Sequence, residues 1–377
     1  MNVYLDHAAT TPVDEEVLQA MLPYFGEVYG NASSQHTVGQ RAQHAVDRAR
    51  DAVAEVLGAK PNEIYFTSGG TESDNWALKG VAYANRDMGR HVVVSAVEHH
   101  AVLNAASWLQ REGWEVAYVP VHADGTIDEE AFAAALRPDT VLASVMTVNN
   151  EVGTIEPIAR IADICHQRGV LLHTDAVQAV GVPEIALDKL GADLVSLSAH
   201  KFYGPKGVGA LYVRGGVRIA PLAHGGAQER GLRGGTYNTP AIVGMACALQ
   251  KAVREAAEDA KRVAAVRDLF EQTVRGAVDC HVNGSTQRRV AANCNLLFDG
   301  VRGESVLLSL DLAGVAAGMG SACTAGTTVA SHVLTAMGLS TDQALSSLRF
   351  TFGKHNTAEE ALYAAEQVVN IVRRLRR

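Results

Sequence analysis

The sequence is poor in cysteine. Its 377 residues include five cysteines, at positions 165, 247, 280, 294 and 323. Their number is odd and no two follow the C-x-x-C spacing, which argues against a disulfide framework and against a structural zinc site. We therefore expect a protein of a reducing compartment, the cytosol.

Long apolar runs and an excess of positive charge are also missing. No apolar run approaches the about 18 residues of a membrane span. The N-terminus has neither the basic region nor the apolar region of a signal peptide. Lys and Arg number 33 against 41 Asp and Glu, a net charge of −8. This balance argues against a nucleic acid or an anionic membrane as partner.

Two further motifs are absent. The phosphate-binding pattern G-x-x-x-x-G-K-[ST] occurs nowhere in the chain, which excludes a P-loop nucleotide site of the usual kind. The 14 histidines show no spacing typical of metal ligands, so we expect no metal centre and give no weight to a metal-dependent hydrolase.

An alternation of strands and helices is present instead. Strand-like runs are predicted at 63–67, 91–95, 115–119, 141–146, 170–174, 193–197 and 208–213, with helical runs between most of them. This pattern predicts an α/β fold with a mostly parallel, seven-stranded sheet between helices. A long helical stretch at 241–277 leads to a smaller α+β part. We place the large domain at 13–255 and the small one at 1–12 with 256–377.

A lysine and an aspartate each follow a predicted strand. Lys201 comes just after the run 193–197, and Asp175 directly follows the run 170–174. Ligands of α/β proteins bind at the carboxyl ends of strands. Pyridoxal phosphate needs this pair, because a lysine forms its Schiff base and an acid faces its pyridinium nitrogen. Taken alone, Lys201 is more typical of an ordinary surface lysine, and only the residues around it favour the reactive amine.

Small and polar residues follow other strands. The segment 68–75 places Gly70 and Thr71 at a helix start, where backbone N–H groups bind an anion, although a plain glycine turn fits too. Ser198, His200 and Thr236 are candidate donors to the same phosphate. His99, Asn150 and Gln178 are candidates for contacts to a planar ring or a carboxylate, against the alternatives of solvated histidine and turn residues.

A cysteine and an arginine complete the candidates. Cys323 lies in the Gly-rich stretch 318–328, whose composition indicates an accessible thiol more than a buried one. Arg349 interrupts a strand-like run, where a carboxylate ligand or a structural ion pair explains it.

Together these segments resemble the pyridoxal-phosphate-dependent cysteine desulfurases of the class V aminotransferase superfamily. The resemblance runs nearly end to end. Its motifs are LDHAATTP at 5–12, GNASSQH at 30–36, TSGGTESDN at 67–75, EHHAV at 98–102, VNNEVG at 148–153, HTDAVQ at 173–178, SAHK at 198–201, GPKGVG at 204–209, RGGT at 233–236 and GSAC at 320–323.

The resemblance implies a pyridoxal-phosphate fold of type I and a homodimer. It implies that Lys201 holds the cofactor, that Asp175 pairs with the ring nitrogen, that His99 stacks on the ring and that Gln178 bonds its phenolic oxygen. The implied phosphate ligands are Gly70, Thr71, Ser198 and His200, with Thr236 from the partner subunit.

For the reaction, the resemblance implies that Arg349 and Asn150 hold the carboxylate of L-cysteine. Cys323 would take the sulfur as a persulfide and leave L-alanine. The sulfur would pass to an acceptor protein, either an iron–sulfur scaffold or a thiolation carrier. A selenocysteine lyase and a class V aminotransferase are the alternatives of the same fold, and a cofactor-bearing sulfur carrier without turnover is the alternative of another class.

Overall fold

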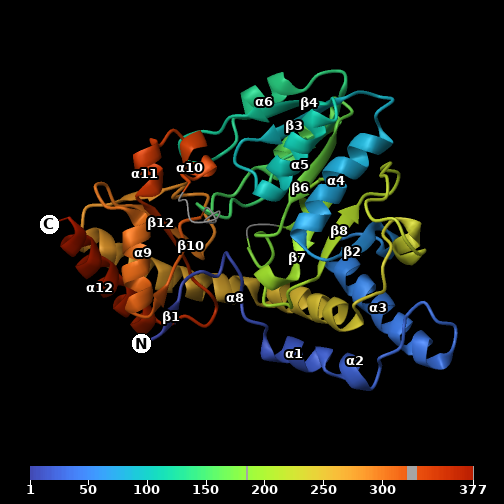
Figure 1. Ribbon diagram of the computed structural model, residues 1–377, viewed down its shortest axis with the longest axis horizontal. Coiled ribbons are helices and arrows are strands. Elements are labelled where there is room, and N and C mark those ends of the chain that lie inside the picture. The colour runs from blue at the N-terminus through green and yellow to red at the C-terminus, as the bar shows by residue number, and fades with distance from the viewer. Residues whose placement is uncertain (184–185, 321–328, 377) are drawn as a thin grey trace.

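The fold has two parts that share one long helix (Figure 1). It is given by a computed structural model that describes residues 1–183, 186–320 and 329–376. Helix α8 (Thr239–Ala277) runs beneath both parts and connects them. Both termini lie on the smaller part.

The larger part is built on a seven-stranded sheet in the order β2-β8-β7-β6-β5-β3-β4. Only β8 runs antiparallel to its neighbours within this sheet, so the expected mostly parallel sheet is confirmed. Its strands are β2 (Ile64–Thr67), β3 (His91–Ser95), β4 (Glu115–Val119), β5 (Thr140–Ser144), β6 (Leu171–Asp175), β7 (Leu194–Ser198) and β8 (Gly209–Val213).

Helices cover both faces of this sheet. In β3, Val93 packs into the core shared with α3, α7 and the first half of α8, while Val92 and Val94 pack against α4 and α5. Successive side chains of a strand point to opposite faces, so a strand buried on both sides reads as an unbroken apolar run. The helices between the strands are α4 (Gly70–Ala84), α5 (His100–Arg111), α6 (Glu129–Ala135) and α7 (Ile158–His166).

The N-terminal segment leads from the small part to the large one. Strand β1 (Val3–Tyr4) pairs in the small part, and α1 (Glu15–Met21), α2 (Pro23–Gly26) and α3 (Thr37–Val56) follow. Asp14 caps α1, since its side chain accepts from Glu16 N. Gly58 adopts φ +60° beyond the end of α3, which is the left-handed conformation that glycine allows.

The smaller part surrounds a core of its own. Phe270 of α8 packs there with Phe350 and Phe352. Its strands are β9 (His281–Asn283), β10 (Asn293–Leu297), β11 (Val315–Ala316) and β12 (Ser347–Thr351), and its helices are α9 (Gly303–Leu312), α10 (His332–Ala336), α11 (Thr341–Leu345) and α12 (Ala358–Leu375). The sequence did not predict β9, α10 or α11, which have three to five residues each.

Short 3₁₀ turns complete the chain: η1 (Pro61–Glu63), η2 (Leu187–Lys189), η3 (Ala199–Lys201) and η4 (Gln228–Gly231). Within the described ranges, none of the helices is both long enough and apolar enough to cross a membrane. The domain boundaries at 12/13 and 255/256 stay a prediction, since α8 passes the second of them without a break.

Candidate active site

The predicted site residues meet in one cavity of about 470 Å³ at the carboxyl ends of the parallel strands. Sites for small molecules have volumes of about 300–1,000 Å³. The cavity is lined by Gly70, Thr71, His99, Asn150, Asp175, Gln178, Ser198, His200, Lys201 and Arg349, with Asp6, Ala8, Ala9, Asp74, Met146, Val177, Gly318, Met319 and Gly320. Among the predicted residues that the structure describes, Thr236 is the one missing from this lining.

One end of the cavity is the start of helix α4. Gly69 leaves β2 with φ +150°, and the helix begins at Gly70. The first N–H groups of a helix have no partner within it and favour an anion. A Cβ atom at Gly70 would lie 2.8 Å from Val177 Cγ2 and 3.5 Å from Ser198 Cβ. Glycine therefore allows β2, β6 and β7 to close around this helix end.

Lys201 lies on the floor of the cavity, one turn after β7. Its Nζ donates to the carbonyl oxygens of Ala8 at 2.6 Å and Ala9 at 2.9 Å. Burial and the charge of Arg349 lower the pKa of Lys201 to about 8, although Asp175 and Asp6 act in the opposite direction. A sizeable share of this amine is therefore neutral, and nucleophilic, near neutral pH.

Asp175 ends β6 and is 5 % exposed. Its Oδ1 accepts from Val177 N at 2.9 Å. Burial raises the pKa of Asp175 to about 6, while the Val177 N–H and Lys201 hold it down. The carboxylate is thus directed at the cavity and has spare acceptor capacity for a protonated ligand.

His99 caps helix α5 from the other side. Its Nδ1 accepts from Ala101 N at 3.1 Å. Burial and the nearby Lys201, His100 and His332 lower the pKa of His99 to about 4. The ring is therefore neutral at pH 7, and because Nδ1 is an acceptor, the proton resides on Nε2.

Arg349 reaches the cavity from β12 of the smaller part. Its Nη1 donates to Asn150 O at 3.0 Å and its Nη2 to Asp6 Oδ1 at 2.7 Å. The side chain is 6 % exposed, and within the described ranges Nε has no hydrogen-bond partner. A buried guanidinium with an unused N–H is suited to bind a carboxylate.

Comparisons with known proteins agree with this geometry. The family model described as aminotransferase class-V matches residues 3–363. The chain is 48 % identical to cysteine desulfurase IscS of Methanosarcina thermophila over 374 residues, 99 % of this chain and 93 % of the relative. It is 46 % identical to the protein of the same name from Dictyoglomus turgidum, with 99 % and 95 % covered.

The chain belongs to the class-V aminotransferase family. Among solved structures, a NifS-like protein aligns with a TM-score of 0.94, 40 % identity and full coverage of both chains. A structure titled SspA in complex with cysteine aligns with a TM-score of 0.83 and 36 % identity, covering 94 % of this chain and all of that one.

Two predicted residues of this class-V chain stand apart from the others. Thr236 is exposed, on a segment that the Arg233–Glu72 ion pair (Nε to Oε1 2.8 Å) ties to the start of α4. Cys323 lies outside the described residues. The described chain before it, Gly318 to Gly320, lines the cavity, and Gly318 pairs with Arg349 through two backbone hydrogen bonds.

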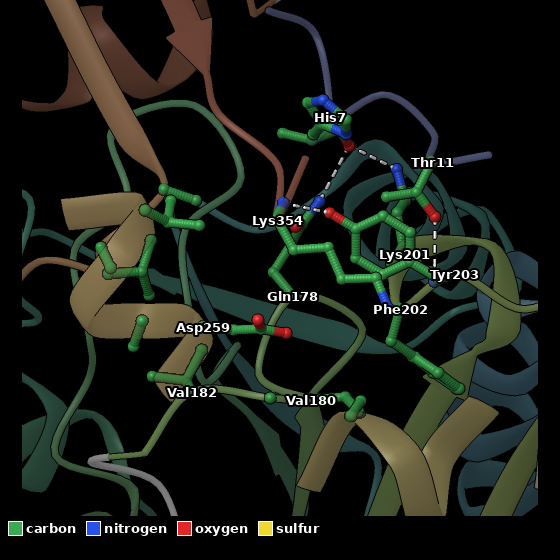
Figure 2. Close-up of a pocket in the computed structure, with 18 of the residues that line it drawn as sticks. His7, Thr11, Gln178, Val180, Val182, Lys201, Phe202, Tyr203, Asp259 and Lys354 are labelled. Carbon is green, nitrogen blue, oxygen red and sulfur yellow. Dashed lines mark hydrogen bonds between the residues drawn. The ribbon is translucent and has the colours of Figure 1, made fainter. Parts of the chain in front are cut away.

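A second cavity lies behind Lys201 and Gln178, between the two parts of the class-V fold. Figure 2 shows His7 on one side of it and Val180 and Val182 on the other. Gln178 Nε2 donates to the Ala8 carbonyl oxygen at 3.0 Å, the same atom that accepts from Lys201. This shared carbonyl lies at the boundary between the two cavities.

Several residues of the site were not predicted from the sequence. Asp6 contacts Arg349 across 343 positions, so no local pattern reveals it. The Ala8 and Ala9 contacts use backbone carbonyls, which carry no residue signal. Asp74 and Glu98 stand inside the motifs TSGGTESDN and EHHAV that we singled out, and only their burial marks them.

Proposed function

We propose that this protein is a pyridoxal-phosphate-dependent cysteine desulfurase that converts L-cysteine to L-alanine and takes the sulfur on Cys323 as a persulfide. One observation carries the proposal. Lys201, Asp175 and Arg349 line a single cavity, and so do Gly318 to Gly320, which directly precede the stretch that contains Cys323. The names of the relatives at 48 % and 46 % identity support the same activity.

The residues present fit pyridoxal phosphate. The start of α4 at Gly70, with Thr71, Ser198 and His200 beside it, suits the phosphate. Asp175 is a buried carboxylate for the ring nitrogen, and Lys201 supplies the amine. His99 and Gln178 line the cavity where they would meet the ring and its phenolic oxygen. When bound, the group draws electrons away from the substrate Cα.

The chain's own residues then bind and orient the substrate. The guanidinium of Arg349 takes the carboxylate of L-cysteine, and its contact with the Asn150 carbonyl oxygen fixes the direction of the side chain. Lys201, once its amine is free again, accepts the Cα proton of the substrate and returns it, because its lowered pKa permits both states near pH 8. Asp6 holds the second edge of Arg349.

The sulfur transfer is a displacement at sulfur. The Cys323 thiolate attacks Sγ of the substrate, the S–S bond forms, and the Sγ–Cβ bond breaks with its electron pair going to Cβ, which takes a proton to give alanine. Cys323 is three residues from Gly320, a span of at most about 11 Å in an extended chain.

The persulfide implies partners. A thiol of a second protein, an iron–sulfur scaffold or a thiolation carrier, would accept the sulfur and return Cys323 to its thiol form. A homodimer would bring Thr236 of one subunit to the phosphate of the other. We place this reaction in the cytosol, the reducing compartment that the cysteine usage favours.

The test is persulfide trapping by mass spectrometry after exposure to L-cysteine. We expect sulfur on Cys323 of the wild type and none in Lys201→Ala, because that variant lacks the amine that binds the cofactor. Alanine formation that persists in Cys323→Ala would contradict the persulfide route. Comparison of L-cysteine with L-selenocysteine separates the desulfurase from a selenocysteine lyase.

A further inference from the structure

Three carboxyl groups are buried together behind the candidate ring site. Asp74 is 1 % exposed, Glu98 0 % and Asp175 5 %. Asp74 comes from α4, Glu98 from the segment between β3 and α5, and Asp175 from the end of β6. The negative charge of Asp175 raises the pKa of both Asp74 and Glu98. Three buried anions so close to one another repel strongly unless cations compensate them.

Compensating cations are scarce. Among the described residues, the only basic side chain in ion-pair contact with Asp74 is His173, with Nε2 3.6 Å from Oδ1. Both ring nitrogens of His173 already bond serine hydroxyls, Nδ1 with Ser144 at 2.8 Å and Nε2 with Ser196 at 2.9 Å. Complete burial lowers the pKa of His173 to about 3. His173 is therefore a neutral imidazole and offers Asp74 no charge.

Lys201 acts on Asp175 and not on the other two carboxyl groups. Its positive charge lowers the pKa of Asp175, which keeps that group the most acidic of the three. Burial and the negative charges of Asp175 and Glu98 disfavour the ionised form of Asp74, and a hydrogen bond from Ser196 favours it. The net effect raises the pKa of Asp74 well above the usual range.

The surroundings of Glu98 likewise disfavour its ionised form. Its Oε1 accepts from Met146 N at 2.5 Å, while among the described residues Oε2 has no partner. Burial and the charge of Asp175 raise the pKa of Glu98 well above the usual range. For Asp74, Oδ1 likewise has no hydrogen-bond partner among the described residues. A carboxylate oxygen buried without a donor is costly, whereas a carboxylic acid is tolerated there.

We propose that Asp74 is a neutral carboxylic acid beside Asp175, and that it is thereby a positioning residue that leaves Asp175 as the anion facing the ring nitrogen of the cofactor. The cofactor role of Asp175 rests on the proposed function. The protonation of Asp74 does not rest on it: its basis is the burial of the cluster, the Oδ1 atom that has no partner among the described residues, and the nearby charge of Asp175. Glu98 is the second neutral acid of the cluster. The three carboxyl groups together thus carry one negative charge, that of Asp175.

The test is infrared spectroscopy of the full chain without cofactor, in D₂O at pH 7. The wild-type spectrum minus that of Asp74→Asn should show the C=O stretching band of a protonated carboxyl group. The Glu98→Gln difference should show a second such band. The Asp175→Asn difference should show the bands of an ionised carboxylate instead. This readout does not depend on desulfurase activity, so its failure can be distinguished from a failure of the proposed function.

A titration tests the coupling without a substitution at position 74. In the wild type the protonated band should persist above the pH at which an ordinary aspartate ionises. In Asp175→Asn a repelling charge is gone, so the midpoint of the Asp74 band should fall by about one unit or more. An unchanged midpoint would overturn the link to Asp175, and a carboxylate band in the Asp74→Asn difference at pH 7 would overturn the protonation itself.

Cofactor binding provides the functional readout. Because asparagine keeps the shape and the neutrality of a protonated aspartate, Asp74→Asn should raise the Kd for pyridoxal phosphate about threefold or less, followed by visible absorbance. Asp175→Asn removes an anion and should raise it about tenfold or more. Equal losses in the two variants would mean that Asp74 is itself an anionic partner, which contradicts the proposal.

Discussion

At the scale of single residues, the titration of Lys201 has a measurable consequence. Its pKa lies near 8, so the neutral amine loses about tenfold in population for each pH unit below that value. We expect the rate of covalent attachment of pyridoxal phosphate to the cofactor-free chain to rise with pH and level off above about 8. Stopped-flow measurements of the visible absorbance will give this midpoint.

Two variants test the cause of the shift in Lys201. Arg349 lowers the pKa of Lys201, so Arg349→Gln should move the midpoint up. Asp175 raises that pKa, so Asp175→Asn should move the midpoint down. A wild-type midpoint near the usual lysine value of 10.5 would contradict the burial that the fold assigns to this amine.

A second residue, Glu156, affects the stability of the folded chain. Its Oε2 accepts from Ile127 N at 2.9 Å and its side chain is buried. Burial raises the pKa of Glu156 from 4.5 to about 8. The stability that its proton contributes is therefore fully present below pH 4.5 and is lost as pH rises through about 8.

Glu156→Gln removes this titration because glutamine is neutral at every pH. We expect the wild type to lose about 1–3 kcal/mol of unfolding free energy relative to the variant between pH 5 and pH 8. Urea denaturation at both pH values measures it. Glu258, which is exposed on α8, supplies the control: Glu258→Gln should show no such difference between the two pH values.

At the scale of elements, the start of α4 is the proposed phosphate-binding end of the cavity. In Gly70→Ala the new Cβ would press on Val177, whose N–H holds the Asp175 carboxylate. We expect the Kd for pyridoxal phosphate to rise about tenfold or more, with a loss of about 1–3 kcal/mol in stability. Titration of the cofactor-free chain by visible absorbance measures the first effect.

Gly276→Ala is the matched control. Gly276 lies in the last turn of α8, and a Cβ there would meet no atom within 4 Å. Alanine favours a helix by up to about 1 kcal/mol over glycine, so this variant should be as stable as the wild type or more so. Equal damage from both substitutions would show that the crowding at Gly70 is not the cause.

Helix α8 connects the two parts of the fold that contribute residues to the site. Its first part, including Met245 and Leu249, packs in the core beneath the large sheet. Its second part, including Phe270 and Val274, packs in the core of the smaller part. Lys201 and Arg349 belong to different parts, so a continuous helix anchored in both cores stabilises the distance between them.

At the scale of the whole molecule, the proposed dimer predicts complementation between defective subunits. Thr236 is exposed and does not line the cavity of its own subunit. If it serves the partner's phosphate, a heterodimer of one Lys201→Ala subunit and one Thr236→Ala subunit contains one intact site, with Lys201 from the second subunit and Thr236 from the first.

Mixed and reassociated subunits with two different affinity tags allow this measurement. We expect the purified heterodimer to bind about half as much pyridoxal phosphate as the wild type, with the wild-type Kd. Should Thr236 act within its own subunit, the heterodimer would show only the weakened binding of Thr236→Ala. A monomer in analytical ultracentrifugation would exclude the shared site altogether.

Much of the fold was readable from the sequence, for local reasons. Strands buried on both faces leave unbroken apolar runs, as in 91–95, and helices leave periodic apolar positions and caps, as at Thr357 with Glu360. The motifs around Lys201, Asp175 and His99 follow strands, and the ends of parallel strands meet at one edge of a sheet. The family, the fold class and the residues to inspect were therefore determined before any coordinates.

The tertiary structure decided which of those residues are charged and what they contact. Asp6 meets Arg349 across 343 positions, and Asp74 and Glu98 join Asp175 from separate elements. Ionisation of a carboxyl group depends on burial and on neighbours that are distant in the chain, neither of which a sequence pattern records. The sequence by itself thus named the chemistry of this protein, and only the packing of elements that are distant in the chain set the charges that the chemistry requires.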